Sequence, residues 1–327
     1  MKSLTILVPN GPHNLSSVVD SYMVFNKANN HWLSRGKKPV FDVQLAGTAR
    51  EVDIYDGLFL IRPKLNIRDI HKTDLVIIPA VLPDFSKTIK QSKALASWIV
   101  EQYEIGAEIA SICTGAFLLA STGLLKGKSC STHWQAANEF RQMYPDVNLV
   151  EDKFITDENG IYTNGGAFSF LNFLIYLVEK YYDRPTAIFC SKIFQIEIDR
   201  NSQSQFTIFT GQKRHGDEVI KKAQARMEKS LHEKISVEHL SSALSVSRRN
   251  FDRRFIKATG NTPTEYLQRI KIEAAKKAFE TSRKAINEVM YEVGYSDVKA
   301  FREVFRKITG VSPLDYRNKY NKEVPVL

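Results

Sequence analysis

Cysteines and long apolar segments are scarce in this chain of 327 residues, and their scarcity excludes two classes of protein. The three cysteines, Cys113, Cys130 and Cys190, are too few for a disulfide framework and fit a reducing compartment. No stretch approaches the roughly 18 consecutive apolar residues of a membrane span. The segment MKSLTILVPNGP carries one lysine before a very short apolar run, which indicates a buried strand and not a signal peptide. We therefore expect a cytoplasmic protein without a membrane partner.

Motifs for nucleotides and metals are missing as well. The sequence has no glycine-rich phosphate loop, no kinase motif and no Cys/His spacing typical of a metal site. We therefore expect neither a cofactor nor a bound metal.

Positive charge is concentrated at one end of the chain. The whole chain has a net charge of +10, and residues 217–327 hold 23 Lys/Arg against 15 Asp/Glu, a net of +8. Residues 1–216 hold 23 against 21, a net of only +2. An excess of this kind predicts a nucleic acid partner for the C-terminal part and not for the rest.

The last quarter of the chain repeats itself at an offset of 50 residues. The matching pairs are Phe251 and Phe301, Phe255 and Phe305, Gly260 and Gly310, Pro263 and Pro313, and Tyr266 and Tyr316. Internal repeats indicate architecture, but two copies are too few for a solenoid. Two copies of a helix with Arg or Lys on its outer face predict two DNA-reading helices.

Local sequence signals divide each copy into a helix, a tight turn and a second helix. In the first copy, Ser236 and Ser247 are candidate N-caps, and Gly260 suits a C-cap. In the second copy, Gly294 marks the turn, and Ser296 or Asp297 is the candidate N-cap. This order is typical of a helix-turn-helix unit. The alternative interpretation of each outer face is a charged surface that only contacts solvent. Two copies in register argue against this alternative.

Residues 231–320 resemble the DNA-binding domain of the AraC/XylS family through SRRNFDRRF, the following ATG, and VGYSDVKAFREVFRKITGVSP. The resemblance implies two helix-turn-helix units joined by a long helix, here 264–279, with both recognition helices in successive major grooves. Val298 and Ala300 depart from the polar residues usual there, so the second unit is expected to use methyl contacts or DNA shape. The predicted DNA-binding residues are Ser247, Arg248, Arg249, Asn250, Asp252, Arg253, Val298, Lys299, Arg302, Glu303 and Arg306.

The first 200 residues alternate between strand and helix patterns. Strands are predicted at 4–9, 40–46, 75–79, 107–112 and 161–163, and helices at 18–28, 89–103, 117–122 and 168–180. The alternation predicts an α/β domain with a mostly parallel sheet sandwiched by helices. Together with the helical repeat, it predicts an α/β N-terminal domain and an all-α C-terminal domain.

A single cysteine marks the junction of the strand at 107–112 with the next helix, in EIASICTGAFLL. Its small neighbours permit a sharp turn like a nucleophile elbow, and a helix N-terminus lowers the pKa of a thiol. The alternative is that Cys113 is a small buried residue filling a tight turn. The elbow alone leaves both interpretations open.

The longer segment SICTGAFLLASTGLLKGKSCSTHW resembles the DJ-1/PfpI branch of the class I glutamine amidotransferase-like superfamily, in the version fused to AraC-type domains known as GlxA-like regulators. The resemblance spans about residues 4–179 and implies a flavodoxin-like sheet. It also implies that Cys113 and His133 face one pocket together with the Gly165-Gly166 turn and the loop 12–17. The predicted ligand-binding residues are His13, Asn14, Ser16, Cys113, Thr114, His133, Trp134, Gly165 and Gly166.

The same resemblance argues against catalysis, because the acids of the related enzymes are missing. Gln135 stands where amidotransferases carry a Glu, and Ser16 or Ser17 stands where DJ-1-like proteins carry one. A nucleophile needs a base, and the base needs an orienting group. Cys113 and His133 are therefore interpreted as a vestigial elbow in a pocket for a small nitrogenous metabolite. Asn172, where many relatives show Asp, weakens the case for a cationic ligand.

We predict three segments: a sensing and dimerisation domain at 1–205, a connector and linker helix at 206–230, and a DNA-binding domain at 231–327. The predicted function is a sequence-specific transcriptional regulator that is not an enzyme. Its expected partners are double-stranded promoter DNA, a small-molecule effector, a second copy of the chain and, as a further candidate, RNA polymerase. The alternatives are a DJ-1/PfpI-type thiol enzyme with an accessory DNA-binding domain and a non-specific nucleoid-type binder.

Overall fold

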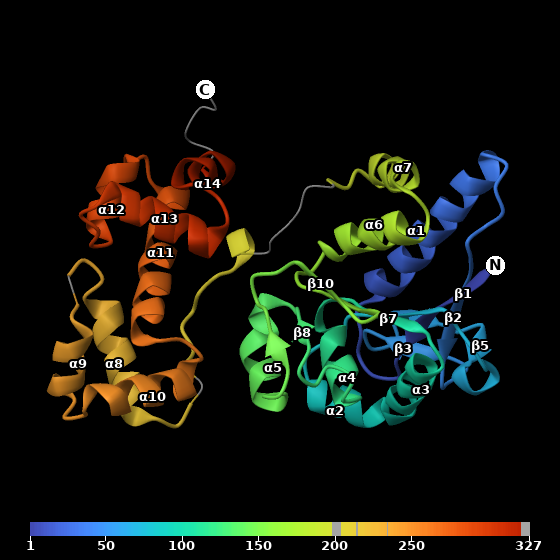
Figure 1. Ribbon diagram of the computed structural model, residues 1–327, viewed down its shortest axis with the longest axis horizontal. Coiled ribbons are helices and arrows are strands. Elements are labelled where there is room, and N and C mark those ends of the chain that lie inside the picture. Colours follow the sequence, from blue (N-terminus) through green and yellow to red (C-terminus); the bar gives the residue numbers. More distant parts are fainter. Residues whose placement is uncertain (198–203, 214, 234, 322–327) are drawn as a thin grey trace. The chain divides into compact units, whose positions relative to one another are not determined.

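A computed structural model describes residues 1–197, 204–213, 215–233 and 235–321. The chain divides into two compact units, Met1–Gln203 and Ser204–Leu327, coloured blue to green and yellow to red in Figure 1. Within the described residues, no helix is long and apolar enough to cross a membrane.

The first unit is built on a seven-stranded sheet with the order β10-β11-β7-β6-β1-β2-β5. Every neighbouring pair in it is parallel except β10 and β11, which are antiparallel. The strands are β1 (Lys2–Val8), β2 (Phe41–Gly47), β5 (Leu65–Asn66), β6 (Leu75–Ile78), β7 (Glu108–Ser111), β10 (Ile155–Glu158) and β11 (Ile161–Asn164). Two short pairs lie outside this sheet, β3 (Val52–Ile54) with β4 (Phe59–Ile61) and β8 (Ser129–Cys130) with β9 (Asn148–Leu149).

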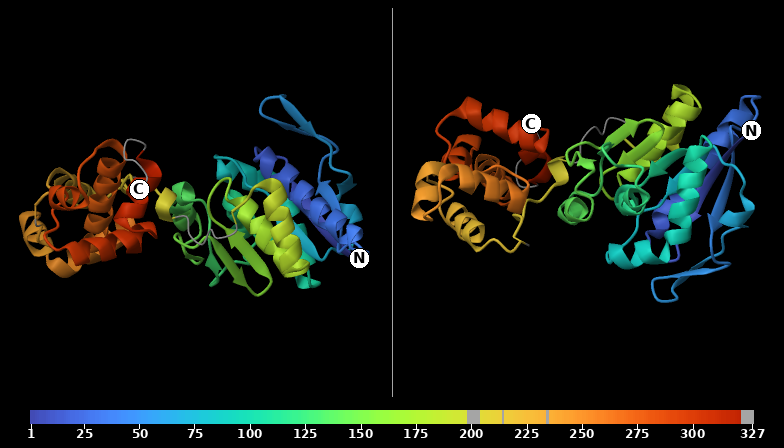
Figure 2. Two further views of the ribbon diagram at one scale, coloured as in Figure 1. Left: turned by 90° about the horizontal axis from the view of Figure 1, so that it is seen from above. Right: turned by 60° about the horizontal axis from the view of Figure 1, so that its bottom comes forward.

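Helices cover both faces of this sheet, as the views in Figures 1 and 2 show. The alternation of side chains along β1 explains why both faces are apolar: Leu4 and Ile6 enter one core, and Leu7 enters the other. Helices α1 (Leu15–Ser34), α6 (Phe170–Tyr181) and α7 (Arg184–Phe194) form the first core, and α2 (Phe85–Gln91), α3 (Lys93–Glu104), α4 (Ala116–Ser121) and α5 (Ala137–Met143) form the second. The predicted α/β class with a mostly parallel sheet is confirmed.

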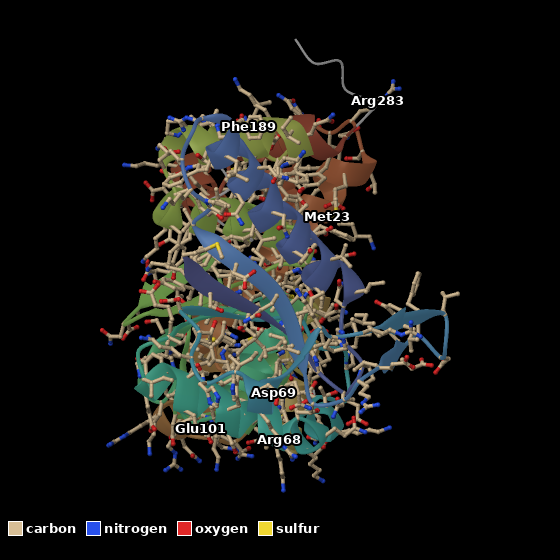
Figure 3. All side chains as sticks on the ribbon, turned by 90° about the vertical axis from the view of Figure 1, so that its right-hand side faces the viewer. Met23, Arg68, Asp69, Glu101, Phe189 and Arg283 are labelled. Carbon is tan, nitrogen blue, oxygen red and sulfur yellow. The ribbon has the colours of Figure 1, made fainter. Side chains whose placement is uncertain are left out.

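Several elements differ from the sequence-based expectation, among them α5, β5, β8, β9 and β10, which were not predicted. The helix predicted at 89–103 is divided into α2 and α3 at Ser92, which caps both. Helix α7, in the last part of the predicted sensing domain, was not predicted, although Asp183 caps it and Pro185 stands in its first turn. The hairpin β3–β4 was not predicted; it projects from the sheet, as Figures 2 and 3 show.

The second unit is helical and contains two cores. Its helices are α8 (Glu218–Lys229), α9 (Val237–Ala243), α10 (Arg248–Thr259), α11 (Pro263–Thr281), α12 (Ile286–Glu292), α13 (Val298–Thr309) and α14 (Pro313–Tyr320). Helices α8 to α10 surround Phe251 and Phe255, and α12 to α14 surround Phe301 and Phe305. Helix α11 contributes to both cores, as the long helix predicted at 264–279 requires. Helix α8, predicted as a linker helix, lies in the first of these cores.

Candidate functional site

The end of β7 forms a strained elbow at Cys113. The residue has a φ of +53°, which is unusual for a side chain with a Cβ. Its backbone N–H donates to Asn164 Oδ1 at 3.0 Å, and its carbonyl accepts from Thr132 Oγ1 at 3.1 Å. A Cβ on Gly115 would lie 2.6 Å from the Pro79 carbonyl, so only glycine lets this turn approach the end of β6. The elbow is therefore fixed by three different segments: the end of β11, the segment around Thr132 and the residues after β6.

Burial controls the chemistry of the Cys113 thiol. It raises the pKa of Cys113 to about 11, although the Thr114 amide and hydroxyl and the His133 backbone N–H, which face the sulfur, lower it. The lowering expected from the helix N-terminus is thus outweighed by the loss of hydration of the thiolate. Cys113 is a protonated thiol at neutral pH, and no carboxylate is among the groups that shift its pKa.

The loop before α1 and the elbow are linked through the residues that follow β6. Asn14 N donates to the Ala80 carbonyl at 2.7 Å, and Ala80 N donates to Ser17 Oγ at 3.1 Å. Thr114 Oγ1 donates to the Val81 carbonyl at 2.6 Å. Two predicted ligand-binding segments, at Asn14 and Thr114, therefore converge on one loop at the carboxyl edge of the sheet, where open α/β sheets bind ligands.

His13 offers a buried hydrogen-bond acceptor in this region. The side chain is fully buried, and its Nδ1 lies 2.9 Å from the Gly11 carbonyl. Because a carbonyl only accepts, Nδ1 carries the proton and Nε2 is the acceptor. Nε2 has no hydrogen-bond partner in the described part of the chain. Burial lowers the pKa of His13, so this neutral form is favoured.

His133 reaches the elbow through its backbone and not through its ring. Its Nδ1 accepts from Gln135 N at 3.2 Å, and its ring lies 5.4 Å from the Trp134 ring in a stacked arrangement. Burial lowers the pKa of His133, and no carboxylate of the described residues is hydrogen-bonded to the ring. The ring is a neutral imidazole without the orienting acid that a catalytic base requires.

The glycine turn after β11 joins the elbow through a residue that the sequence analysis missed. Asn164 accepts from Cys113 N and also donates to the Gly165 carbonyl at 3.0 Å. Gly166 has a φ of +90°, which favours glycine. Asn164 and Thr132 were not predicted, and their only sequence signal is that each is adjacent to a predicted residue. Ser17 lies in the segment 12–17, which the resemblance placed at the pocket, but it was not among the predicted ligand-binding residues. The predicted residues Ser16 and Trp134 are half buried and have no described hydrogen bond to the elbow.

The first candidate recognition helix, α10, has several of its charges engaged within the protein. Arg248 Nε lies 2.9 Å from Asp252 Oδ2, and Arg248 also pairs with Glu238. Asn250 Oδ1 accepts from Arg253 at 3.0 Å. Arg249 is exposed, and Ser247 stands at the N-cap without a side-chain capping bond. Because of these intramolecular pairs, fewer cations of α10 remain free to contact DNA.

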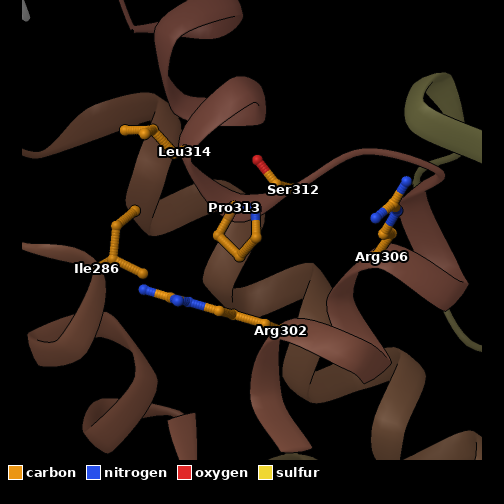
Figure 4. A pocket seen from close by; sticks show the side chains of 6 residues that line it. All are labelled: Ile286, Arg302, Arg306, Ser312, Pro313 and Leu314. Carbon is orange, nitrogen blue, oxygen red and sulfur yellow. The ribbon is translucent and has the colours of Figure 1, made fainter. Parts of the chain in front are cut away.

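The second candidate recognition helix, α13, carries exposed cations without such pairs. No carboxylate of the described residues lies within ion-pair distance of Lys299, Arg302 or Arg306. Glu303 is also exposed, whereas Val298 is half buried and packs against the core. Figure 4 shows Arg302 reaching along a hollow of about 400 Å³. The residues lining the hollow are Ile286, Arg302, Arg306, Ser312, Pro313 and Leu314.

The fold and these sites define a two-domain protein: an α/β domain with a buried cysteine elbow, followed by two helix-turn-helix units. The DJ-1/PfpI family model matches residues 31–180, and a helix-turn-helix domain model matches residues 240–319. The chain therefore combines a DJ-1/PfpI domain with a helix-turn-helix domain of the AraC type.

Two curated transcriptional regulators match about two thirds of this chain or more at 23–26% identity. The HTH-type transcriptional regulator GbdR of Pseudomonas aeruginosa is 26% identical over 237 residues, which are 71% of this chain and 63% of that protein. The HTH-type transcriptional regulator GlxA of Rhizobium meliloti is 23% identical over 219 residues, 66% of each. The match to the first of these relatives thus spans less than two thirds of its length.

Solved structures show the fold of the first unit. Drosophila melanogaster DJ-1beta has a TM-score of 0.50 and 19% identity, and covers 60% of this chain and 98% of its own. A THiJ/PfpI family protein from Pseudomonas syringae has a TM-score of 0.50 and 15% identity, with 61% and 76% covered. These likenesses establish a DJ-1-like sheet.

Proposed function

We propose that this protein is a sequence-specific transcriptional regulator whose DJ-1-like domain binds a small effector. The observation that carries the proposal is the pair of helix-turn-helix units, whose recognition helices present exposed cations on a basic domain. Cations of this kind contact phosphates, and Arg reads guanine edges in the major groove. The two curated relatives, both transcriptional regulators, support the same function.

The chemistry around the elbow narrows the class of effector. His13 Nε2 is a buried acceptor without a partner among the described residues, and a neutral His133 lies beside Trp134. A ligand with an N–H or O–H donor would satisfy His13, because unpaired buried polar groups are costly. We therefore propose a small, nitrogen-containing metabolite such as an amino acid or an amine. Asn14, Ser16, Thr114, Gly165 and Gly166 would complete the pocket.

Selection from a genomic fragment library tests the regulator function directly. The purified full chain is mixed with the fragments at physiological salt, and the bound fragments are sequenced. We expect a few sites, each with two half-motifs about one helical turn (~10.5 base pairs) apart. Uniform recovery, with less than about tenfold preference for any site, would favour a non-specific binder.

Effector binding is tested with the site obtained in that selection. The functions of the genes beside the selected sites suggest which amino acids and amines to test. Each compound is titrated into the protein, and its effect on DNA affinity is measured. We expect the effector to change DNA affinity by about 5–150-fold, the usual range of allosteric coupling. His13→Leu should abolish the response while leaving effector-free DNA binding intact. Unchanged DNA affinity for a ligand that binds the pocket would contradict a sensor.

A thiol enzyme is the alternative, and the reactivity of Cys113 separates it from a sensor. With a pKa of about 11, Cys113 should alkylate slowly at neutral pH and faster as the pH approaches that value. Cys113→Ser should leave DNA binding and the effector response intact. Rapid alkylation at pH 7, or turnover that Cys113→Ser abolishes, would favour the enzyme.

A second copy of the chain is the remaining proposed partner, together with RNA polymerase at the promoter. Helix α1 carries exposed apolar side chains, among them Met23, which is labelled in Figure 3, and Val19. Exposed apolar surface of this kind marks protein contacts. Light scattering of the full chain at micromolar concentration should give the mass of a dimer; a monomer at all concentrations would contradict dimerisation.

A further inference from the structure

Helix α11 is shared by two cores, and the change from one core to the other occurs at Lys271. Tyr266 and Ile270 lie in the core of the first helix-turn-helix unit, and Ile272 and Phe279 lie in the core of the second. Lys271 stands between Ile270 and Ile272. A charged side chain at this position is unexpected, because the neighbouring residues on both sides are buried and apolar.

The ammonium group of Lys271 is buried and forms hydrogen bonds with both helix-turn-helix units. The residue is 6% exposed. Its Nζ donates to the Glu233 carbonyl, in the loop before α9, at 3.3 Å and to the Gly294 carbonyl, in the turn between α12 and α13, at 3.1 Å. The Tyr295 ring lies 5.6 Å away. A buried ammonium is costly unless it is hydrogen-bonded, so the two carbonyls must remain where they are.

No carboxylate of the described residues lies within ion-pair distance of Lys271, so the two carbonyls and the aromatic ring are its described partners. Carbonyl oxygens accept hydrogen bonds roughly along their lone-pair directions, so two carbonyls from different loops together favour one position of the ammonium. The contact therefore holds the two loops at one distance from each other.

Gly294 lets the two units approach at the same point. Its φ is +73°, and a Cβ there would lie 2.6 Å from Lys271 Nζ and 2.8 Å from the carbonyls of Leu231 and His232. The turn of the second unit thus lies directly on the loop before the first. Glycine is required here both by the backbone angle and by the lack of space.

We propose that Lys271 is a positioning residue that holds the two recognition helices in one register, and so sets the half-site spacing that the protein accepts. The proposal rests on the proposed function, because a fixed register matters only if both helices read the same DNA. An added base pair moves one half-site by 3.4 Å and rotates it by about 35°. A rigid pair of helices cannot follow that change, and a loosened pair can.

The spacing test uses the full chain and the selected DNA site, with one base pair inserted or removed between its half-motifs. We expect the wild type to lose about tenfold or more in affinity for either change, and Lys271→Met to lose less than about threefold. Lys271→Arg, which retains hydrogen-bond donors, should restore discrimination. Equal discrimination by wild type and Lys271→Met would overturn the proposal.

A matched control separates positioning from stability. Ile272→Ala removes a buried side chain from the same helix but from only one core, and does not touch the carbonyls that Lys271 joins. Urea titration establishes that it is at least as destabilised as Lys271→Met. Ile272→Ala should keep the spacing preference of the wild type. If it relaxes that preference equally, loss of stability explains the effect and positioning by Lys271 is wrong.

A measurement without DNA distinguishes failure of this proposal from failure of the regulator function. Spin labels are attached through Lys257→Cys and Lys307→Cys, equivalent exposed positions on α10 and α13. The three native cysteines are buried. The distance distribution between the labels should be narrow in wild type and in Ile272→Ala, and broader in Lys271→Met. An unchanged distribution would contradict the proposal even if the protein reads DNA as expected.

Discussion

The two helix-turn-helix units are built from one repeated pattern, yet they differ at the turn between their helices. Four residues separate α9 from α10, Leu244 to Ser247, and five separate α12 from α13, Val293 to Asp297. The left-handed position of the first turn is Ser245, with φ +56°, and that of the second is Gly294. Ser245 is exposed, whereas Gly294 lies against another loop. The same backbone shape thus tolerates a side chain only where it faces solvent.

The units also differ in how their charges are used. Arg248 on α10 is paired with Asp252, whereas Arg302 on α13 has no ion pair among the described residues. Arg254 on α10 bonds to Asp217 at 2.6 Å, at the N-cap of α8. The first helix-turn-helix unit therefore uses part of its positive charge in contacts within the protein. The second helix-turn-helix unit leaves more of its positive charge available for DNA.

The largest expected effect comes from the turn. Gly294→Val should destabilise the chain by about 2–5 kcal/mol, because it combines backbone strain with overlap at the carbonyls of Leu231 and His232. Ser245 already has a positive φ, so Ser245→Val should cost less, only the additional strain of a β-branched side chain, roughly 1 kcal/mol. Urea unfolding of both variants measures the difference. Equal losses would show that crowding at Gly294 has no energetic weight.

The second largest expected effect is on the affinity for DNA and on the preference for particular bases. Arg249→Ala and Arg302→Ala should each weaken binding to the selected site by about 1–3 kcal/mol and relax base choice at one position. Fluorescence anisotropy with single-base variants of the site measures both quantities. If the loss is the same on every sequence, these side chains contact phosphates and not bases.

A smaller effect separates DNA-facing cations from structural ones. Arg306→Ala should reduce the slope of log affinity against log salt by about 0.9, as expected for one lost phosphate contact. Arg254→Ala should leave that slope unchanged, because Asp217 already holds its guanidinium. Binding at four or five salt concentrations is sufficient. A reduced slope for Arg254→Ala would assign Arg254 to the DNA surface.

The smallest effect is the pH dependence of the Arg254 contact. The hydrogen bond from Arg254 lowers the pKa of Asp217 below its ordinary value of 3.8. Its stabilising contribution is therefore complete above that value and is lost as the pH falls through the lower folded-state pKa. Asp217→Asn, which keeps the N-cap, should be less stable than wild type at pH 7 and equally stable in strong acid. A difference that does not depend on pH would exclude the charge as its cause.

Local signals in the sequence predicted most of the helical unit. Thr262 and Glu265 form a capping box, Gly260 and Gly310 adopt the left-handed C-cap conformation, and Asp297 caps α13. Each of these depends on side chains within four residues of one another, so the sequence alone contains the information. Helix α7 carries the same kind of local signal, with Asp183 at its N-cap and Pro185 in its first turn, and it could have been predicted in the same way.

For the candidate sensor site, the sequence indicated which segments take part but not which of their residues contact one another. The motif around Cys113 indicated the elbow, but Asn164, which lies 51 residues further along, is the residue that bonds to its amide. The pKa of Cys113 shows the same limitation. The helix N-terminus suggested a lowered value, whereas burial raises it to about 11, and burial depends on packing that no local pattern records.

The sequence by itself determined the repeat, the basic C-terminal part, the strand and helix periods and the caps, because these follow from the order of neighbouring residues. Only the tertiary structure decided which cations are engaged and which remain exposed. Arg254 meets Asp217 across 37 residues, and Lys271 meets carbonyls 38 and 23 residues away. Such pairs form because packing of the apolar helix faces brings distant segments together, and the hydrophobic effect that drives this packing is not directional.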